Sequence, residues 1–173
     1  MKKIAKPETD EYAPYTIMYI GLLPDDGLVL KHLADNLTTT CAFIRALPEE
    51  KLSYRYAPGK WTIREILAHI VDDERIYAYR ALRFARNDKT ELPGFDQDNY
   101  ALHSGANQRT IESLLREFAA VRNATIALFE SFDEQVLTRK GVAGGNVMSV
   151  RAAAYHIAGH ELRHVNIIKE RYL

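Results

Sequence analysis

Four long segments of the sequence carry apolar residues at every third or fourth position, which is the spacing of an amphipathic α-helix. They cover residues 26–47, 62–87, 110–132 and 149–172. No segment alternates apolar and polar residues between turn signals, so we expect no β-strands. Helices of similar length in a chain of 173 residues bury their apolar faces most simply against one another. The pattern therefore predicts an all-α fold, a four-helix bundle.

The ends of these helices carry recognisable signals. Pro48 ends the first helix, and Thr62 with Glu65 has the spacing of a capping box at the start of the second. Ser149 is the expected N-cap of the fourth helix. The predicted boundaries therefore rest on capping chemistry as well as on periodicity.

The connection between the second and third helices, residues 87–107, is long for a compact domain. Connections of this length often form lids or walls of binding pockets, and a simple crossover is the alternative. If the segment walls a pocket, we expect it to contribute some of Phe95, Asp96, Asp98 and Tyr100.

Acidic and basic residues are equal in number, 23 of each, so the formal net charge is zero. Binding to a phosphate backbone or an anionic membrane needs a basic excess, so we expect neither partner. The longest apolar run, residues 15–23, is shorter than the about 20 residues that span a bilayer. The single cysteine, Cys41, suits a reducing compartment and a place in the core. We therefore expect a cytoplasmic protein in which residues 1–173 form one domain, with residues 1–24 as an N-terminal extension.

Three histidines recur at intervals of four in the fourth predicted helix: His156, His160 and His164. Side chains four positions apart lie one above the other on a helix, so two of these imidazoles could bind one metal ion. At about 100° per residue, His164 lies about 40° from His160 inside the apolar stripe, and His156 lies on its rim. Two inward imidazoles each need a partner. A shared cation is one solution, and hydrogen bonds within the core are the other.

His69 is the candidate for a third ligand. It lies about 12 Å from the start of the second predicted helix, and His164 lies about as far from the end of the fourth. If these helices are antiparallel neighbours, three imidazoles can converge at one height. Asp72 and Asp73 each lie within a turn of His69, and either could orient an imidazole by a hydrogen bond. Glu74 is expected to be a surface charge or a charge-pair partner on its own helix.

Several stretches resemble the DinB-like superfamily of metal-dependent enzymes, also called YfiT-like. They are residues 56–62, 69–75, 79–86, 92–96 and 159–164, which together extend over nearly the whole chain. The resemblance implies a four-helix bundle in which three histidines bind a divalent metal, commonly within a homodimer. The matching positions are His69, His160 and His164, and the metal implied is zinc or nickel.

The resemblance also bears on the carboxylates and on the reaction. Asp72 matches the acidic residue that commonly follows the first histidine by three positions in this family, which favours Asp72 over Asp73 for a role at the site. Relatives include S-transferases that use low-molecular-weight thiols, and proteins called hydrolases. The implied function is thus a hydrolase or a thiol-dependent S-transferase that acts on a small molecule.

The alternative is a non-catalytic, metal-binding structural bundle. In that case Asp72, Asp73 or His156 would close the site as a fourth protein ligand. The coordination sphere separates the two hypotheses, because a catalytic site keeps one exchangeable position and a structural site is closed.

Overall fold

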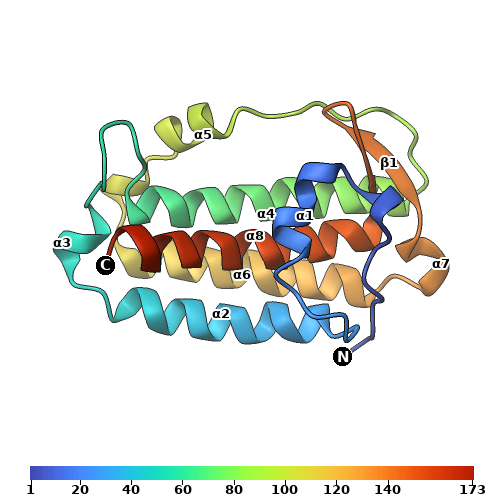
Figure 1. Cartoon of the computed structure of the whole chain (residues 1–173), viewed down its shortest axis with the longest axis horizontal. Coiled ribbons are helices and arrows are strands. Elements are labelled where there is room, and N and C mark those ends of the chain that lie inside the picture. The colour runs from blue at the N-terminus through green and yellow to red at the C-terminus, as the bar shows by residue number, and fades with distance from the viewer.

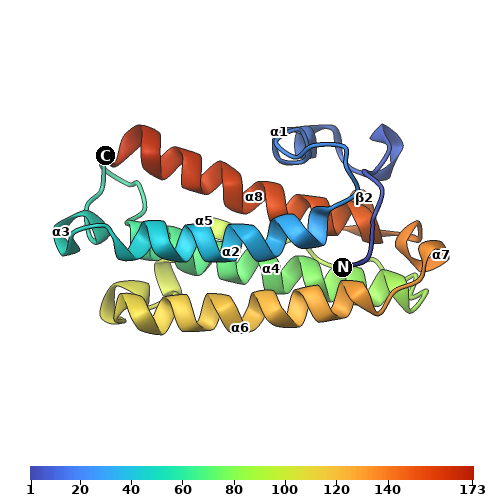
Figure 2. The same ribbon diagram turned by 90° about the horizontal axis from the view of Figure 1, so that it is seen from below.

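Four long helices lie lengthwise in the computed structural model, which describes all residues 1–173 (Figures 1 and 2). They are α2 (Val29–Arg45), α4 (Ile63–Ala85), α6 (Ile111–Glu130) and α8 (Val150–Arg171). Short helices in the connections are α3 (Glu49–Leu52) and α7 (Glu134–Leu137). The four predicted helices are confirmed, and their ends differ from the prediction by one to three residues.

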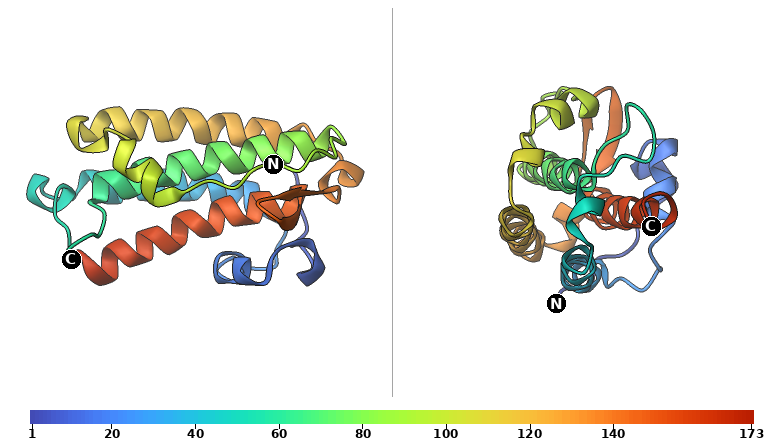
Figure 3. Two further views of the ribbon diagram at one scale, coloured as in Figure 1. Left: turned by 90° about the horizontal axis from the view of Figure 1, so that it is seen from above. Right: turned by 90° about the vertical axis from the view of Figure 1, so that its left-hand side faces the viewer.

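The four helices form a square when they are viewed end-on (Figure 3). α4 packs against α8 and α6, and α2 packs against the same two helices. α4 and α8 are antiparallel, as expected, whereas α4 and α6 run in the same direction (Figure 1). The chain must therefore return along the length of the bundle between α4 and α6. This return is why the connection over residues 87–107 is long.

Side chains that accept hydrogen bonds from free amide groups set the starts of α4 and α8. Thr62 accepts from the Glu65 amide, and the Glu65 carboxylate accepts from the Thr62 amide at 2.7 Å, which completes the predicted capping box. The Ser149 hydroxyl accepts from the amide three residues further on at 3.0 Å. α2 begins later than expected, at Val29, because Gly27 turns the chain with a φ of 71°.

The return connection has structure of its own. It contains α5 (Gln97–His103) and the short 3-10 helix η3 (Ala106–Gln108). The Leu92 amide donates to the Val142 carbonyl at 3.0 Å, and the Leu92 carbonyl accepts from the Gly144 amide at 2.8 Å. These bonds and the packing of α5 on α4 hold the connection against the bundle.

The expectation of no strands is wrong. β1 (Lys140–Ala143) and β2 (Asn146–Ser149) pair as an antiparallel hairpin. The turn is Gly144 and Gly145, with φ of 57° and 75°, a conformation that glycine adopts without strain. Each strand has only four residues, so no sustained alternation is visible in the sequence. The adjacent glycines are the signal that periodicity overlooked.

Residues 1–24 pack against α8 (Figure 2). This segment contains η1 (Thr9–Glu11), η2 (Pro14–Thr16) and α1 (Ile17–Ile20). α1 approaches α8 so closely that a Cβ at position 159 would lie 2.2 Å from the Tyr19 carbonyl oxygen. Gly159 therefore permits the contact, and the N-terminal segment lies next to the part of α8 that carries His160.

Apolar side chains fill both halves of the bundle in two clusters. Cys41 is buried in one of them, as expected for a small core residue, and burial raises the pKa of its thiol. None of the helices combines the length and the apolar composition needed to cross a membrane.

A buried cluster of charged side chains links all four long helices. Arg122 of α6 donates to Glu74 of α4 at 2.8 Å and lies 2.8 Å from a Glu161 carboxylate oxygen of α8. It also donates to the Leu33 carbonyl of α2 at 2.7 Å. Thr40 of α2 donates to Glu161 at 2.6 Å. The expectation for Glu74 is wrong, because its carboxylate is only 1% exposed and neutralises Arg122 inside the core.

Replacing Arg122 should strongly destabilise the fold, because two carboxylates would stay buried without a cation. We expect Arg122→Met to lower the free energy of unfolding by about 3–5 kcal/mol. Arg45→Met is the matched control, because Arg45 pairs with Glu112 on the surface, where such pairs contribute about 0–1 kcal/mol. Urea denaturation followed by circular dichroism measures both values. Equal effects of the two substitutions would show that the buried cluster does not hold the bundle together.

Candidate metal centre

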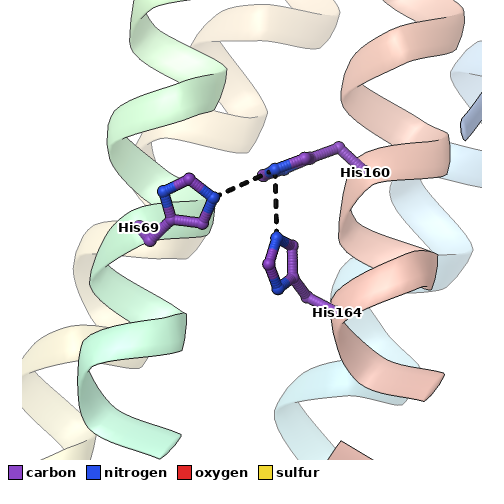
Figure 4. Close-up of side chains that lie close together, drawn as sticks. All are labelled: His69, His160 and His164. Atoms are coloured by element: carbon purple, nitrogen blue, oxygen red, sulfur yellow. Dashed lines mark hydrogen bonds between the residues drawn. The ribbon is translucent and has the colours of Figure 1, made fainter. Parts of the chain in front are cut away.

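His69, His160 and His164 meet between α4 and α8 (Figure 4). The Nε2 atom of His160 lies 3.1 Å from Nε2 of His69 and 3.1 Å from Nε2 of His164. One nitrogen from each ring falls within 4.8 Å of the others, and no other group of histidine, cysteine or acidic side chains in the chain converges in this way. The antiparallel packing of α4 and α8 thus brings together the three imidazoles that the sequence placed at one height.

The donor set fits a divalent cation. In a tetrahedral zinc site with Zn–N bonds of about 2.0–2.1 Å, the ligand nitrogens lie about 3.3 Å apart. The two separations of 3.1 Å are close to that value. Burial lowers the pKa of all three imidazoles, that of His164 to about 3 and that of His160 well below its ordinary value. The rings are therefore neutral at physiological pH, the form that binds metal.

Asp73, one turn after His69 on α4, lies on the other side of the His160 ring. One carboxylate oxygen is 3.4 Å from Nδ1 of His160 and 3.1 Å from Nε2 of His156. Burial alone would raise the pKa of Asp73, but the imidazoles of His160 and His156 lower it below its ordinary range. An ionised carboxylate beside Nδ1 keeps the proton on that nitrogen and leaves Nε2 of His160 free to bind a cation.

Asp72 lies on a different side of α4. Its carboxylate is 3.7 Å from the Arg75 guanidinium, and its side chain is 33% exposed. It borders a cavity with Glu117 of α6. Asp73 follows His69 by four positions, about 40° around the helix, whereas Asp72 follows by three and lies about 60° away in the other direction. The structure therefore corrects the expected placement, because Asp73 and not Asp72 is the carboxylate beside the histidines.

His156 does not join the other three rings. It stacks on Tyr77 with ring centroids 3.6 Å apart, and its Nε2 faces Asp73. Its Nδ1 atom is buried without a hydrogen-bond partner. Because His156 and Asp73 contact each other on the Nδ1 side of His160, neither of them faces the three converging nitrogens.

A cavity of about 300 Å³ opens beside His164. Trp61 lines it and packs on His69 with ring centroids 4.7 Å apart. Since Trp61 directly precedes the capping box of α4, the start of that helix fixes the position of the indole. Asp98 is the only acidic residue on the cavity wall, and Lys60 is the only lysine or arginine.

The return connection contributes to the surroundings of the histidines, as expected of a pocket wall. Asp98 lines the cavity beside His164. Phe95 lines a smaller cavity of about 160 Å³ that also borders His160. Asp96 instead caps α5, and Tyr100 borders a separate cavity. Two of the four residues proposed from the sequence therefore approach the histidines.

Sequence reasoning missed Tyr19, which the N-terminal segment places against the histidines. The Tyr19 ring meets those of His156 and His160 edge-on, with centroids 4.9 and 5.3 Å away. The available signal was Gly159, a glycine inside a long helix directly before His160. Such a glycine often marks the close approach of another backbone.

Comparisons with known proteins agree with this architecture. A protein of Oceanobacillus iheyensis, named provisionally as a metal-dependent hydrolase, is 28% identical over 128 residues, which cover 73% of this chain and 73% of the relative. YfiT from Bacillus subtilis is described as a probable metal-dependent hydrolase with an unusual four-helix bundle topology. Its structure matches with a TM-score of 0.70 at 16% identity, over 95% of this chain and 90% of that chain. The structural likeness confirms the four-helix bundle.

The family comparison confirms the resemblance seen in the sequence. The profile of the DinB superfamily matches residues 32–168. The matched region begins within α2, ends within α8 and includes all three converging histidines. This chain belongs to the DinB superfamily.

Proposed function

We propose that this protein is a metal-dependent enzyme that holds a divalent cation, zinc or nickel, through His69, His160 and His164. The observation that carries the proposal is the convergence of three neutral imidazoles beside a cavity. Catalytic sites keep one exchangeable position, whereas structural sites close with four protein ligands. Asp73 and His156 contact each other away from the three nitrogens, which supports an enzyme over a non-catalytic bundle.

A bound divalent cation supplies a Lewis acid that polarises a substrate and acidifies a water or thiol. The side chains of the protein position the groups around it. Asp73 holds the Nδ1 proton of His160 and so fixes the orientation of that ring. We assign Asp98 to accept the proton that an attacking water or thiol loses, because it is the only carboxylate on the cavity wall. Lys60 offers a positive charge to an anionic group of the substrate.

Hydrolysis of a small molecule is the reaction that we favour. Both relatives described above carry the name of a metal-dependent hydrolase. A cavity of about 300 Å³ suits a small substrate. Transfer of a low-molecular-weight thiol is the second candidate, supported by the sequence resemblance to thiol-dependent S-transferases. The homodimer, the cytoplasmic location and the absence of a nucleic-acid partner stay predictions.

Metal content tests the ligand set directly. We expect the purified, untagged protein to bind about one divalent cation per chain, in line with a single three-histidine site. His160→Ala should abolish this binding, because His160 lies between the other two rings. His103→Ala is the control, since His103 is exposed and bonds only to the Asn99 carbonyl. Elemental analysis that finds full metal content in His160→Ala would overturn the ligand assignment.

The same proteins then test the reaction. The metal-loaded wild type is assayed with chromogenic esters, amides and phosphoesters, and with an aryl halide in the presence of several thiols. Turnover that is lost in His160→Ala and kept in His103→Ala supports a metal-dependent enzyme, and the reactive substrate class separates hydrolase from transferase. Full metal binding without turnover in any assay would favour the non-catalytic alternative.

The pH dependence of metal affinity should reflect the burial of the ligands. An exposed imidazole with a pKa of about 6.5 begins to release metal near that pH. Burial lowers the pKa of His69, His160 and His164, so protons compete only at lower pH. We expect the affinity to be nearly constant from pH 7.5 to about 6 and to fall at lower pH, as imidazole protonation requires. A tenfold loss centred near pH 6.5, measured by chelator competition, would indicate exposed histidine ligands instead.

Paired substitutions distinguish the two neighbouring aspartates. Asp73→Asn should weaken zinc affinity by about 10- to 100-fold, because the carboxylate orients His160. Asp72→Asn removes the same charge from the same turn of α4 but should leave affinity within about twofold, since it is not second shell. Competition with a fluorescent zinc chelator measures both. If Asp72→Asn has the larger effect, the role that we assign to Asp73 is wrong.

A further inference from the structure

Arg80 of α4 is a buried arginine without a carboxylate partner. Three arginines in the chain are more than nine-tenths buried: Arg64, Arg80 and Arg122. Arg64 pairs with Glu49, and Arg122 pairs with glutamates of two helices. Arg80 forms no ion pair, although an arginine keeps its charge inside proteins. A buried charge without a counterion is unfavourable, so the surroundings of Arg80 call for an explanation.

Protein contacts use only part of the guanidinium. Nη2 of Arg80 donates to the Pro93 carbonyl at 3.2 Å, which is its only hydrogen bond within the protein. The group also lies over the rings of Tyr77 and Phe95, with centroids 4.8 and 5.8 Å away. These contacts hold the planar group in place. They leave most of its N–H donors free for a ligand.

The guanidinium borders a cavity of about 320 Å³ between α4 and the return connection. Leu92 and Phe95 provide apolar walls, and the hydroxyl-bearing Tyr79 and Tyr100 lie at the same cavity. No acidic residue lines it. The second arginine on the wall, Arg75, is already neutralised by Glu117 of α6 at 2.6 Å and by Asp72. The cavity therefore has a single uncompensated positive charge.

We propose that this cavity binds the carboxylate of a small organic anion with an apolar body, and that Arg80 is its anchor. A planar guanidinium matches a carboxylate with two parallel hydrogen bonds. A monoanion balances the one unpaired charge, whereas a phosphate dianion would bring an excess of negative charge. The apolar walls suit a hydrocarbon or aromatic body, and the tyrosine hydroxyls can donate further hydrogen bonds.

This site is separate from the histidine centre. None of the converging histidines borders the Arg80 cavity. Phe95 lies between the two, because it also lines the small cavity beside His160. The proposed anion site therefore does not depend on a bound cation or on the proposed enzymatic activity.

Benzoate titrations of the full-length protein test the proposal. Binding is followed by isothermal titration calorimetry and by the ligand-induced rise in melting temperature, with benzyl alcohol as the neutral probe. We expect benzoate to bind and Arg80→Met to weaken it by about 10- to 100-fold, the effect of losing a charge-assisted hydrogen-bonded pair. Arg86→Met is the matched control on the same helix, because Arg86 is exposed and lies outside the cavity, and its affinity should be unchanged.

Two further arms make the result decisive. Benzoate binding should persist in His160→Ala, which separates the Arg80 site from carboxylate binding to a metal. If Arg80→Met fails to fold, Arg80→Lys keeps the charge without the planar fork, and a clear loss of benzoate affinity is again expected. The proposal is overturned if benzyl alcohol binds as well as benzoate, if benzoate does not bind, or if binding is lost in His160→Ala and kept in the Arg80 variants.

Discussion

The positive charge of Arg122 lies at the centre of the bundle, where water cannot solvate it and only carboxylates from other helices can balance it. Glu74 and Glu161 meet this requirement from α4 and α8. Each is the sequence neighbour of a residue at the candidate metal centre, since Glu74 follows Asp73 and Glu161 follows His160. The register that pairs the charges is therefore the register that brings the metal centre together.

The same cost of burying polar groups explains the metal centre. Three buried imidazoles cannot all satisfy one another, because neutral rings have one donor and one acceptor nitrogen each. Asp73 occupies the Nδ1 side of His160, so the Nε2 lone pair points at the other two rings. A cation satisfies all three nitrogens at once. Arg80 shows the opposite case, a buried cation whose remaining donors face a cavity without acidic residues.

Local patterns in the sequence carried most of the fold and the three histidines. Helical periodicity located the long helices, and spacing alone placed His160 and His164 on one face and His69 at the same height. These features depend on helix geometry, which is the same wherever a helix lies. The parallel direction of α4 and α6 was implicit only in the length of residues 87–107.

Features that depend on which helix faces which could not be read in this way. Asp72 and Asp73 differ by one position, and the choice between them needs the direction of α8 relative to α4. The burial of Glu74 depends on an arginine 48 positions later in the chain. The resemblance to the family favoured Asp72, whereas the position of the His160 ring favours Asp73.

X-ray absorption spectroscopy of the zinc-loaded, full-length protein tests the central claim most directly, because it reports the atoms bound to the metal. The account predicts three imidazole nitrogens at about 2.0–2.1 Å and one further light ligand that is not imidazole. A sulfur shell at about 2.3 Å or a spectrum without imidazole scattering would contradict it.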